Sequence, residues 1–298
     1  MPCATIHLLV ADGLLEEWVE RPREAPIDAT EPELRAAFLH GSLAPDMGFI
    51  PGVDRLVSEL SHYVTPIRLT RALLEGAETP LDKAFAWGWI AHVIGDVEIH
   101  PIVGRAVGER LYGDRGHRVD AAEDPETHVS VEVGLDVAFF KNHPRVSPPP
   151  RAPHFNQTRV GHFQGALART YGVAWSAAHL VQGHDRAVRL TCRWPMALRA
   201  LARARRGFSL GARLARAGTA TRGFFRPLPP PSWMVSEVSS AIEAFPGRVR
   251  AIVAEGLAGL PDRNLETGGP AGTGLGHPAS DEAARKLDAI RGLRGATT

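Results

Sequence analysis

The sequence predicts an all-α fold. β-branched residues almost never alternate with polar residues over five or more positions, which is the pattern of a half-buried strand. Long segments rich in Ala, Leu, Arg and Glu dominate instead, and these residues favour helices. We therefore expect a helical bundle with additional helices toward the C-terminus.

Helical periodicity predicts the elements in chain order. The expected helices are residues 32–40, 53–63, 66–76, 80–99, 102–111, 125–141, 160–171, 175–206, 208–217, 232–258 and 281–294. Proline lacks the backbone donor that a helix interior needs, so Pro195 should kink or split the 175–206 helix. Pro246 is a candidate break in the 232–258 helix for the same reason.

Three segments have the composition of linkers. Residues 144–153 hold five prolines, Arg226–Ser232 has the sequence RPLPPPS, and the glycine-rich Gly268–Gly276 is expected to be flexible. No repeat of fixed period is present. We expect one helical domain over residues 1–298, with a histidine-rich half (1–143) and an Arg-rich helical extension (154–298).

Length and composition exclude several classes of protein. A chain of 298 residues that is 44% hydrophobic, with a net charge of +1, buries a core and is not disordered. Two cysteines exclude a disulfide scaffold. No stretch of eighteen uncharged apolar residues exists, so no transmembrane helix is expected. The N-terminus lacks a basic segment, which predicts a cytoplasmic location.

Charge is distributed unevenly along the chain. Residues 1–143 carry 12 Lys/Arg and 24 Asp/Glu, whereas residues 144–298 carry 22 and 9. Eleven arginines and no acid lie between Arg186 and Arg226. Ala and Leu separate these arginines at helical spacing, which favours side chains that extend along packed helices. A phosphate-attracting field beside an active site is the alternative, and the two are compatible.

Two predicted helices carry stripes of histidine and carboxylate. His92, Asp96 and His100 follow each other at i, i+4 and i+8, and His128, Glu132 and Asp136 repeat this spacing. Residues four apart share one face of a helix, where an imidazole and a carboxylate can reach one divalent ion. A self-satisfied buried His–Asp pair explains one stripe as well as a metal does. Two stripes favour metal.

The surroundings of the first stripe strengthen this interpretation. Trp87, Trp89 and several aliphatic residues make its helix apolar on all sides, which is typical of a buried helix. Charged groups there are costly unless they are paired or bind metal. Three more candidates lie elsewhere: Asp46 in a Gly/Pro loop, His62 near the end of a helix, and His7 in an apolar run. Taken singly, these three would be a turn residue, a helix-terminal histidine and a core histidine.

As a set, these residues resemble the zinc-dependent phospholipase C family. The matching pieces are His7, GSLAPD ending at Asp46, His62, AWGWIAHVIGDVEIHP with His92, Asp96 and His100, and HVSVE with His128 and Glu132. The resemblance covers about residues 1–140. It implies an all-helical bundle like those of phospholipase C and the S1/P1 nucleases, with a trinuclear zinc cluster.

The resemblance also implies a role for each residue. Asp46, His62, His92 and Asp96 would hold a first zinc; His100, His128 and Glu132 a second; and His7, with Asp96 bridging, a third. The His92–His100 spacing is shorter than in the secreted phospholipases, so Glu98 competes with His100 as a ligand. Asp136 and Glu98 are also candidates to orient a ligating histidine.

The residue types suit this chemistry. Nitrogen and oxygen ligands without cysteine favour Zn²⁺ and leave Mn, Fe and Ni open. Together with the resemblance, they lead us to expect two or three zinc ions. Neighbouring ions would activate a water and neutralise a phosphoryl group, with Asp46 or a bridging hydroxide as the base.

The main hypothesis is a zinc-dependent hydrolase of phosphoester bonds, similar to phospholipase C, that acts on a phospholipid or a small phosphodiester. A metal-dependent nuclease or phosphatase is an alternative, since the Arg-rich half offers cations to a nucleic-acid backbone. It is weaker because the arginines lack interleaved aromatic residues. A non-hydrolytic metal enzyme, or a scaffold that reuses the fold, is a further alternative.

Overall fold

The computed structural model describes residues 4–50, 53–142, 160–203, 219–257 and 262–295. Within these ranges every regular element is a helix, and the isolated bridge between Arg263 and Pro270 is the one piece of β-pairing. The predicted all-α fold is therefore confirmed. None of the described helices is both long and apolar enough to cross a membrane.

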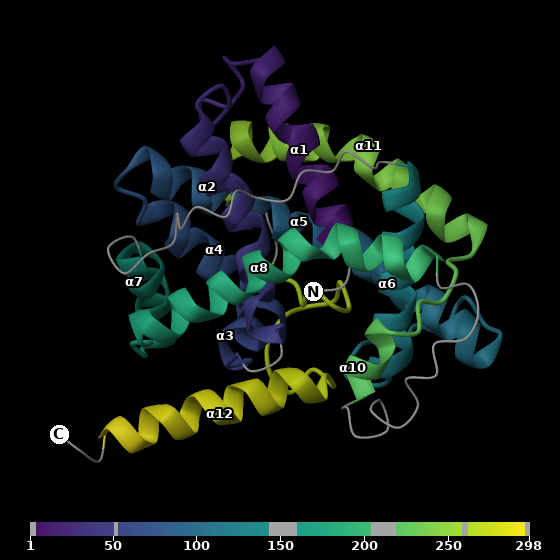
Figure 1. Ribbon diagram of the computed structural model, residues 1–298. Helices are drawn as coiled ribbons and strands as arrows, with labels where there is room; N and C mark the ends of the chain where they lie inside the picture. Colours follow the sequence, from purple (N-terminus) through teal and green to yellow (C-terminus); the bar gives the residue numbers. More distant parts are fainter. Residues whose placement is uncertain (1–3, 51–52, 143–159, 204–218, 258–261, 296–298) are drawn as a thin grey trace.

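The helices follow one another along the chain as shown in Figure 1. They are α1 (Ala4–Glu20), α2 (Pro32–Leu43), the 3₁₀ segment η1 (Ala44–Phe49), α3 (Leu56–Glu59), the π-helical turn η2 (Leu60–Val64), α4 (Pro66–Glu75), α5 (Pro80–Tyr112), α6 (Pro125–Asn142), α7 (Val160–Tyr171), α8 (Ala177–Arg203), α10 (Thr219–Phe224), α11 (Ser232–Glu255) and α12 (Pro278–Gly295). The α1 and α11 helices cross near one end of the molecule, and α12 lies along the opposite side (Figure 1).

Helix α5 forms the centre of the fold. It begins with a capping box between Thr79 and Asp82 and ends at Gly113, whose φ of 69° suits a left-handed C-cap. Among the described residues, its side chains enter three separate hydrophobic clusters: Trp89 in one, Ile90 in a second and Val103 in a third. The predicted burial of this helix on all sides is thus confirmed, and its polar residues lie inside the protein.

Two glycines allow α2 and α5 to cross at backbone contact. A Cβ atom on Gly41 would lie 2.0 Å from the Phe85 carbonyl oxygen, and one on Gly88 would lie 1.9 Å from the Phe38 carbonyl oxygen. No larger side chain fits at either position. This close crossing brings the backbone at the end of α2 next to His92 of α5.

The structure corrects several predicted boundaries. Helix α5 continues through Pro101, where a break between 99 and 102 was expected, and α11 continues through Pro246. Helix α8 is not split at Pro195, the stronger of the two effects expected there. Tertiary packing of the flanking turns outweighs the single backbone hydrogen bond that each proline removes. Helix α1 was not predicted, because buried residues surround it and leave no amphipathic period.

The expected linkers differ from one another. Residues 227–231 form no regular secondary structure, and the Leu228 N–H donates to the Ser130 carbonyl of α6. The glycine-rich segment 268–276 is attached to the core at its middle, where the Gly272 N–H donates to the Tyr63 carbonyl of η2. The proline-rich residues 144–153 and the predicted helix 208–217 lie outside the described residues.

Candidate metal centre

Asp96 lies at the centre of a buried cluster of histidines. Its Oδ1 is 3.1 Å from His7 Nε2 and 3.6 Å from His100 Nε2, and its Oδ2 is 3.0 Å from His92 Nε2 and 3.3 Å from His62 Nε2. The Asp96 side chain is only 2% exposed. Four imidazoles from three helical elements therefore converge on one carboxylate.

Asp46 joins this cluster from the other side. Its Oδ1 lies 3.3 Å from His62 Nε2 and 3.8 Å from His92 Nε2. The turn that carries it is fixed by Ser58, whose hydroxyl accepts from the Gly48 N–H and donates to the Pro45 carbonyl. The loop carboxylate predicted from GSLAPD thus points into the cluster.

Backbone carbonyls orient three of the imidazole rings. His62 Nδ1 lies 2.7 Å from the Ser58 carbonyl oxygen, His92 Nδ1 lies 2.9 Å from that of Ser42, and His100 Nδ1 lies 3.0 Å from that of Leu265. A carbonyl oxygen only accepts, so each Nδ1 carries the proton. In the neutral ring Nε2 then presents a lone pair to the cluster, which is how a second partner prepares a metal-ligating histidine.

The residues around Asp96 and Asp46 form a first group of ligands, which has the arrangement of a cation site: His7, Asp46, His62, His92 and Asp96. His62 Nε2 and His92 Nε2 face each other at 3.4 Å, and among the described residues only imidazole nitrogens approach Asp96 Oδ2 closely. Lone pairs of nitrogen and oxygen at these distances repel unless a proton or metal ion lies between them. Two triplets inside this group, His7–His92–Asp96 and Asp46–His62–His92, each have ligand atoms that all lie within 4.8 Å of one another.

A second group of candidate ligands, His100, His128 and Glu132, lies beside the first. His128 Nε2 is 3.4 Å from Glu132 Oε1, and His100 Nε2 is 3.5 Å from the same oxygen. His100 is also 3.6 Å from Asp96, so this residue connects the two groups. All eight residues that the sequence predicted as ligands therefore lie together, with His7 stacked on His92 at 4.0 Å between ring centroids.

Glu266 enters the second group from a distant part of the chain. Its Oε1 lies 3.3 Å from His128 Nε2 and its Oε2 lies 3.7 Å from His100 Nδ1, and the residue is 7% exposed. Sequence reasoning missed it, because a single glutamate in the turn NLETGG has no periodic partner. Its proximity to the histidines arises only from the tertiary fold.

Asp136 and Glu98 hold partners other than the cluster histidines. Asp136 is fully buried, and it accepts from the Thr5 N–H at 3.0 Å and from Trp194 Nε1 at 2.9 Å. It thus fixes the first turn of α1, which carries His7. Burial raises the pKa of Asp136 to about 7, although both donors act in the opposite direction. Glu98 forms an ion pair with Arg248.

The electrostatics of the cluster favour added positive charge. Burial raises the pKa of Asp46 and Asp96, but the surrounding histidines outweigh this effect and lower the pKa of both carboxyls. Burial would lower the pKa of His62, yet Asp46 and Asp96 raise it to about 9. Burial lowers the pKa of His7, with His92 adding to the effect. The donor set of buried imidazoles and carboxylates fits Zn²⁺.

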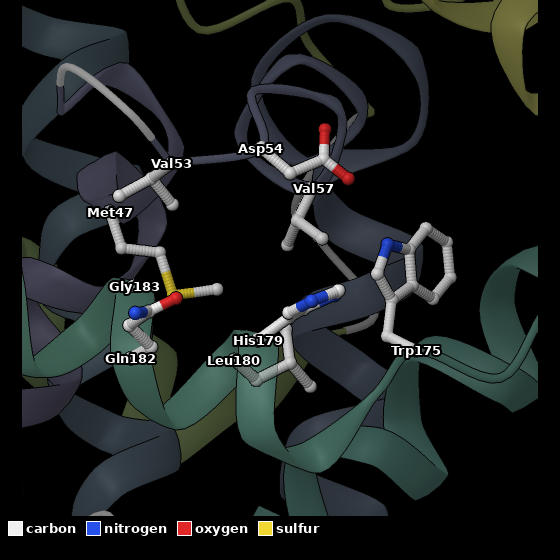
Figure 2. A pocket seen from close by; sticks show the side chains of 9 residues that line it. All are labelled: Met47, Val53, Asp54, Val57, Trp175, His179, Leu180, Gln182 and Gly183. Carbon is white, nitrogen blue, oxygen red and sulfur yellow. The ribbon is translucent and has the colours of Figure 1, made fainter.

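A small pocket lies next to the segment that carries Asp46, since Met47 is one of the residues that line it. The pocket has a volume of about 210 Å³. It lies between the η1–α3 segment and the start of α8 (Figure 2). Trp175, His179 and Leu180 line one side, and Met47 and Val57 line the other. None of the cluster residues lines it.

The arginines of the C-terminal half contact acids and rings of the N-terminal half. Arg222 and Arg226 lie 3.2 Å and 3.4 Å from carboxylate oxygens of Glu126, and the Arg199 guanidinium lies over the Phe140 ring. These contacts agree with the interpretation of arginines that pack on helices. Arg205 and Arg206, which belong to the same arginine-rich stretch, lie outside the described residues.

Comparisons with known proteins point to one family. The profile described as "Zinc dependent phospholipase C" matches residues 18–179. An uncharacterized protein of Archaeoglobus fulgidus is 30% identical over 106 residues, which is 35% of this chain. The match covers only 29% of the length of that relative. No solved structure matches.

Proposed function

Because the chain belongs to the zinc-dependent phospholipase C family, we propose that it is a multinuclear zinc-dependent hydrolase of phosphoester bonds. The observation that carries this proposal is the convergence of His7, His62, His92 and His100 on the buried Asp96. A structural role alone would not require four buried imidazoles around one carboxylate.

The contacts support the division of ligands that the family resemblance implies. In the proposal, Asp46, His62, His92 and Asp96 bind one zinc, His100, His128 and Glu132 bind a second, and His7 and Asp96 bind a third. The second group packs against Asp96 through His100. The halves 1–143 and 154–298 act as one domain in this proposal, since Leu265 O orients His100.

Bound zinc would lower the pKa of a coordinated water and neutralise the charge of a phosphoryl group. The residues of the chain would supply the remaining functions. Asp46 is the candidate to accept the proton of the attacking water, because its side chain is 10% exposed whereas that of Asp96 is 2% exposed. The neighbouring His92 and His62 keep the pKa of Asp46 low, so the carboxylate is ionised. Ser42 and Ser58 would hold the imidazoles in place through their carbonyl groups.

The substrate class in this proposal is a phospholipid or a small phosphodiester. A nuclease is the second candidate, but the ion pairs and ring contact of Arg222, Arg226 and Arg199 use the charges that a nucleic-acid backbone would need. We therefore place phosphodiesters and phospholipids before nucleic acid.

The experiment is a panel of substrates assayed with zinc-loaded and chelator-treated protein. The panel contains bis(p-nitrophenyl) phosphate, p-nitrophenyl phosphate, phosphatidylcholine vesicles and single-stranded DNA. We expect hydrolysis of a diester or the phospholipid that is lost on chelation and restored by zinc. The Asp46→Asn and His128→Ala variants should lose it, and Glu98→Gln, outside the cluster, should keep it. Full activity in the chelated protein or in both cluster variants would contradict the proposal.

A further inference from the structure

Glu266 reaches the second group of ligands from beyond the segment that the family profile covers, which ends at residue 179. We propose that Glu266 is an additional zinc ligand, and that zinc bound there fixes the C-terminal segment 262–272 to the helical core. This inference rests on the proposed zinc cluster. It adds a ligand and a structural consequence that the motif residues do not supply.

The position of the Glu266 carboxylate supports direct coordination. Its Oε1 lies 3.3 Å from His128 Nε2, a nitrogen that also lies 3.4 Å from Glu132 Oε1. His128 Nε2 thus lies between two carboxylates, as Asp96 lies between two pairs of imidazoles. An ion bound by His128 and Glu132 would have the Glu266 carboxylate within its immediate surroundings.

The burial of Glu266 needs a cation. Among the described residues, its carboxylate accepts one backbone hydrogen bond, from the Ala121 N–H at 2.9 Å, and its other close contacts are imidazoles. A buried carboxylate with a single neutral donor is costly unless an opposite charge lies beside it. Protonated His128 and His100 provide that charge without metal, and a divalent ion provides it without protonation.

Hydrogen bonds to the backbone of residues 265–267 hold Glu266 in place. Asn264 Oδ1 accepts from the Glu266 N–H at 2.9 Å and from the Thr267 N–H at 3.1 Å. Leu265 is fully buried in the core, and its N–H donates to the His62 carbonyl oxygen at 2.8 Å. The turn is thus attached to η2, which carries a ligand of the first group, and Glu266 points toward the second.

The same turn connects to α12. Gly272 N–H donates to the Tyr63 carbonyl, and the Ser280 hydroxyl near the start of α12 lies 3.3 Å from the same oxygen. A zinc ion held by His128, Glu132 and Glu266 would therefore link α6 to the segment that precedes α12. Loss of that ion should loosen the 262–272 segment before it loosens α5 or α6.

The test uses the full chain, stripped of metal by a chelator and then titrated with Zn²⁺. Zinc stoichiometry comes from equilibrium dialysis with elemental analysis, and amide hydrogen exchange reports on residues 262–272. The variants are Glu266→Gln, which keeps an acceptor for the Ala121 N–H, Glu266→Asp, which keeps the charge, and Glu98→Gln as the control. Circular dichroism of the metal-free variants checks that they fold.

We expect zinc to slow exchange in residues 262–272 of the wild-type protein. Glu266→Gln should bind one zinc at least about tenfold more weakly and lose this protection, since losing even an outer partner of a ligand costs 10–100-fold in affinity. Glu266→Asp should recover part of the zinc affinity and part of the protection from exchange. Glu98→Gln should have the zinc affinity and the protection of the wild type. If the Glu266→Gln protein binds zinc as tightly as the wild type and zinc still slows exchange in its residues 262–272, this inference alone is overturned. Absence of zinc binding in the wild type would overturn the proposed function and this inference together.

Discussion

The metal-free protein should lose stability as the pH rises from neutral to alkaline values. Asp46 and Asp96 raise the pKa of buried His62 from 6.5 to about 9. Between pH 6.5 and 9, His62 is therefore protonated in the folded state and neutral in the unfolded chain. The stabilising effect is fully present below pH 6.5 and disappears as the pH passes 9. A difference of about 2.5 pKa units corresponds to roughly 3 kcal/mol for His62.

The assay is urea denaturation of chelator-treated protein between pH 6 and 9.5, with and without excess zinc. Zinc competes with protons for the same nitrogens, so the zinc-loaded protein should keep its stability, or gain some, over this range. His62→Gln should reduce the pH dependence of the metal-free protein, whereas a change at the exposed His179, His179→Gln, should not. A metal-free protein that becomes more stable from pH 6.5 to 9 would refute the reasoning.

Two further predictions concern packing and the start of α1. Gly88→Ala should destabilise the protein by about 1–3 kcal/mol or more, because the added Cβ would lie 1.9 Å from the Phe38 carbonyl oxygen. Gly13→Ala, whose Cβ would have nothing within 4 Å, should stabilise helix α1 by about 0.5–1 kcal/mol. Equal midpoints of thermal unfolding for the two variants would contradict this. Asp136→Ala should cost roughly 2–5 kcal/mol in denaturant unfolding, because it leaves the Thr5 N–H and Trp194 Nε1 buried without an acceptor. It should also weaken zinc binding at His7, and an unchanged unfolding midpoint would argue against the role of Asp136 as an anchor of α1.

Much of the candidate site could be predicted from local patterns. His92, Asp96 and His100 share one stripe of α5, and His128 and Glu132 share one of α6, because helical spacing alone places them together. Burial of α5 followed from its apolar residues. The family resemblance then linked these stripes to Asp46, His62 and His7.

The remaining features depend on contacts between distant segments. Glu266 lies 134 positions after Glu132 in the sequence, and nothing near it in the chain signals a ligand. His62 lies on a single π-helical turn, whose widened backbone no periodic pattern indicates. Asp136 has the spacing of a ligand stripe, but α1 and Trp194 occupy its oxygens. Tertiary packing decided each of these cases.

Metal content of the purified protein tests the central claim most directly. Elemental analysis of the wild type should give two or three zinc ions per chain. Asp96→Asn, which removes the charge facing four imidazoles, and His128→Ala should each contain less zinc. A wild-type protein that holds no zinc after incubation with excess Zn²⁺, or an Asp96→Asn protein with full zinc content, would contradict the account.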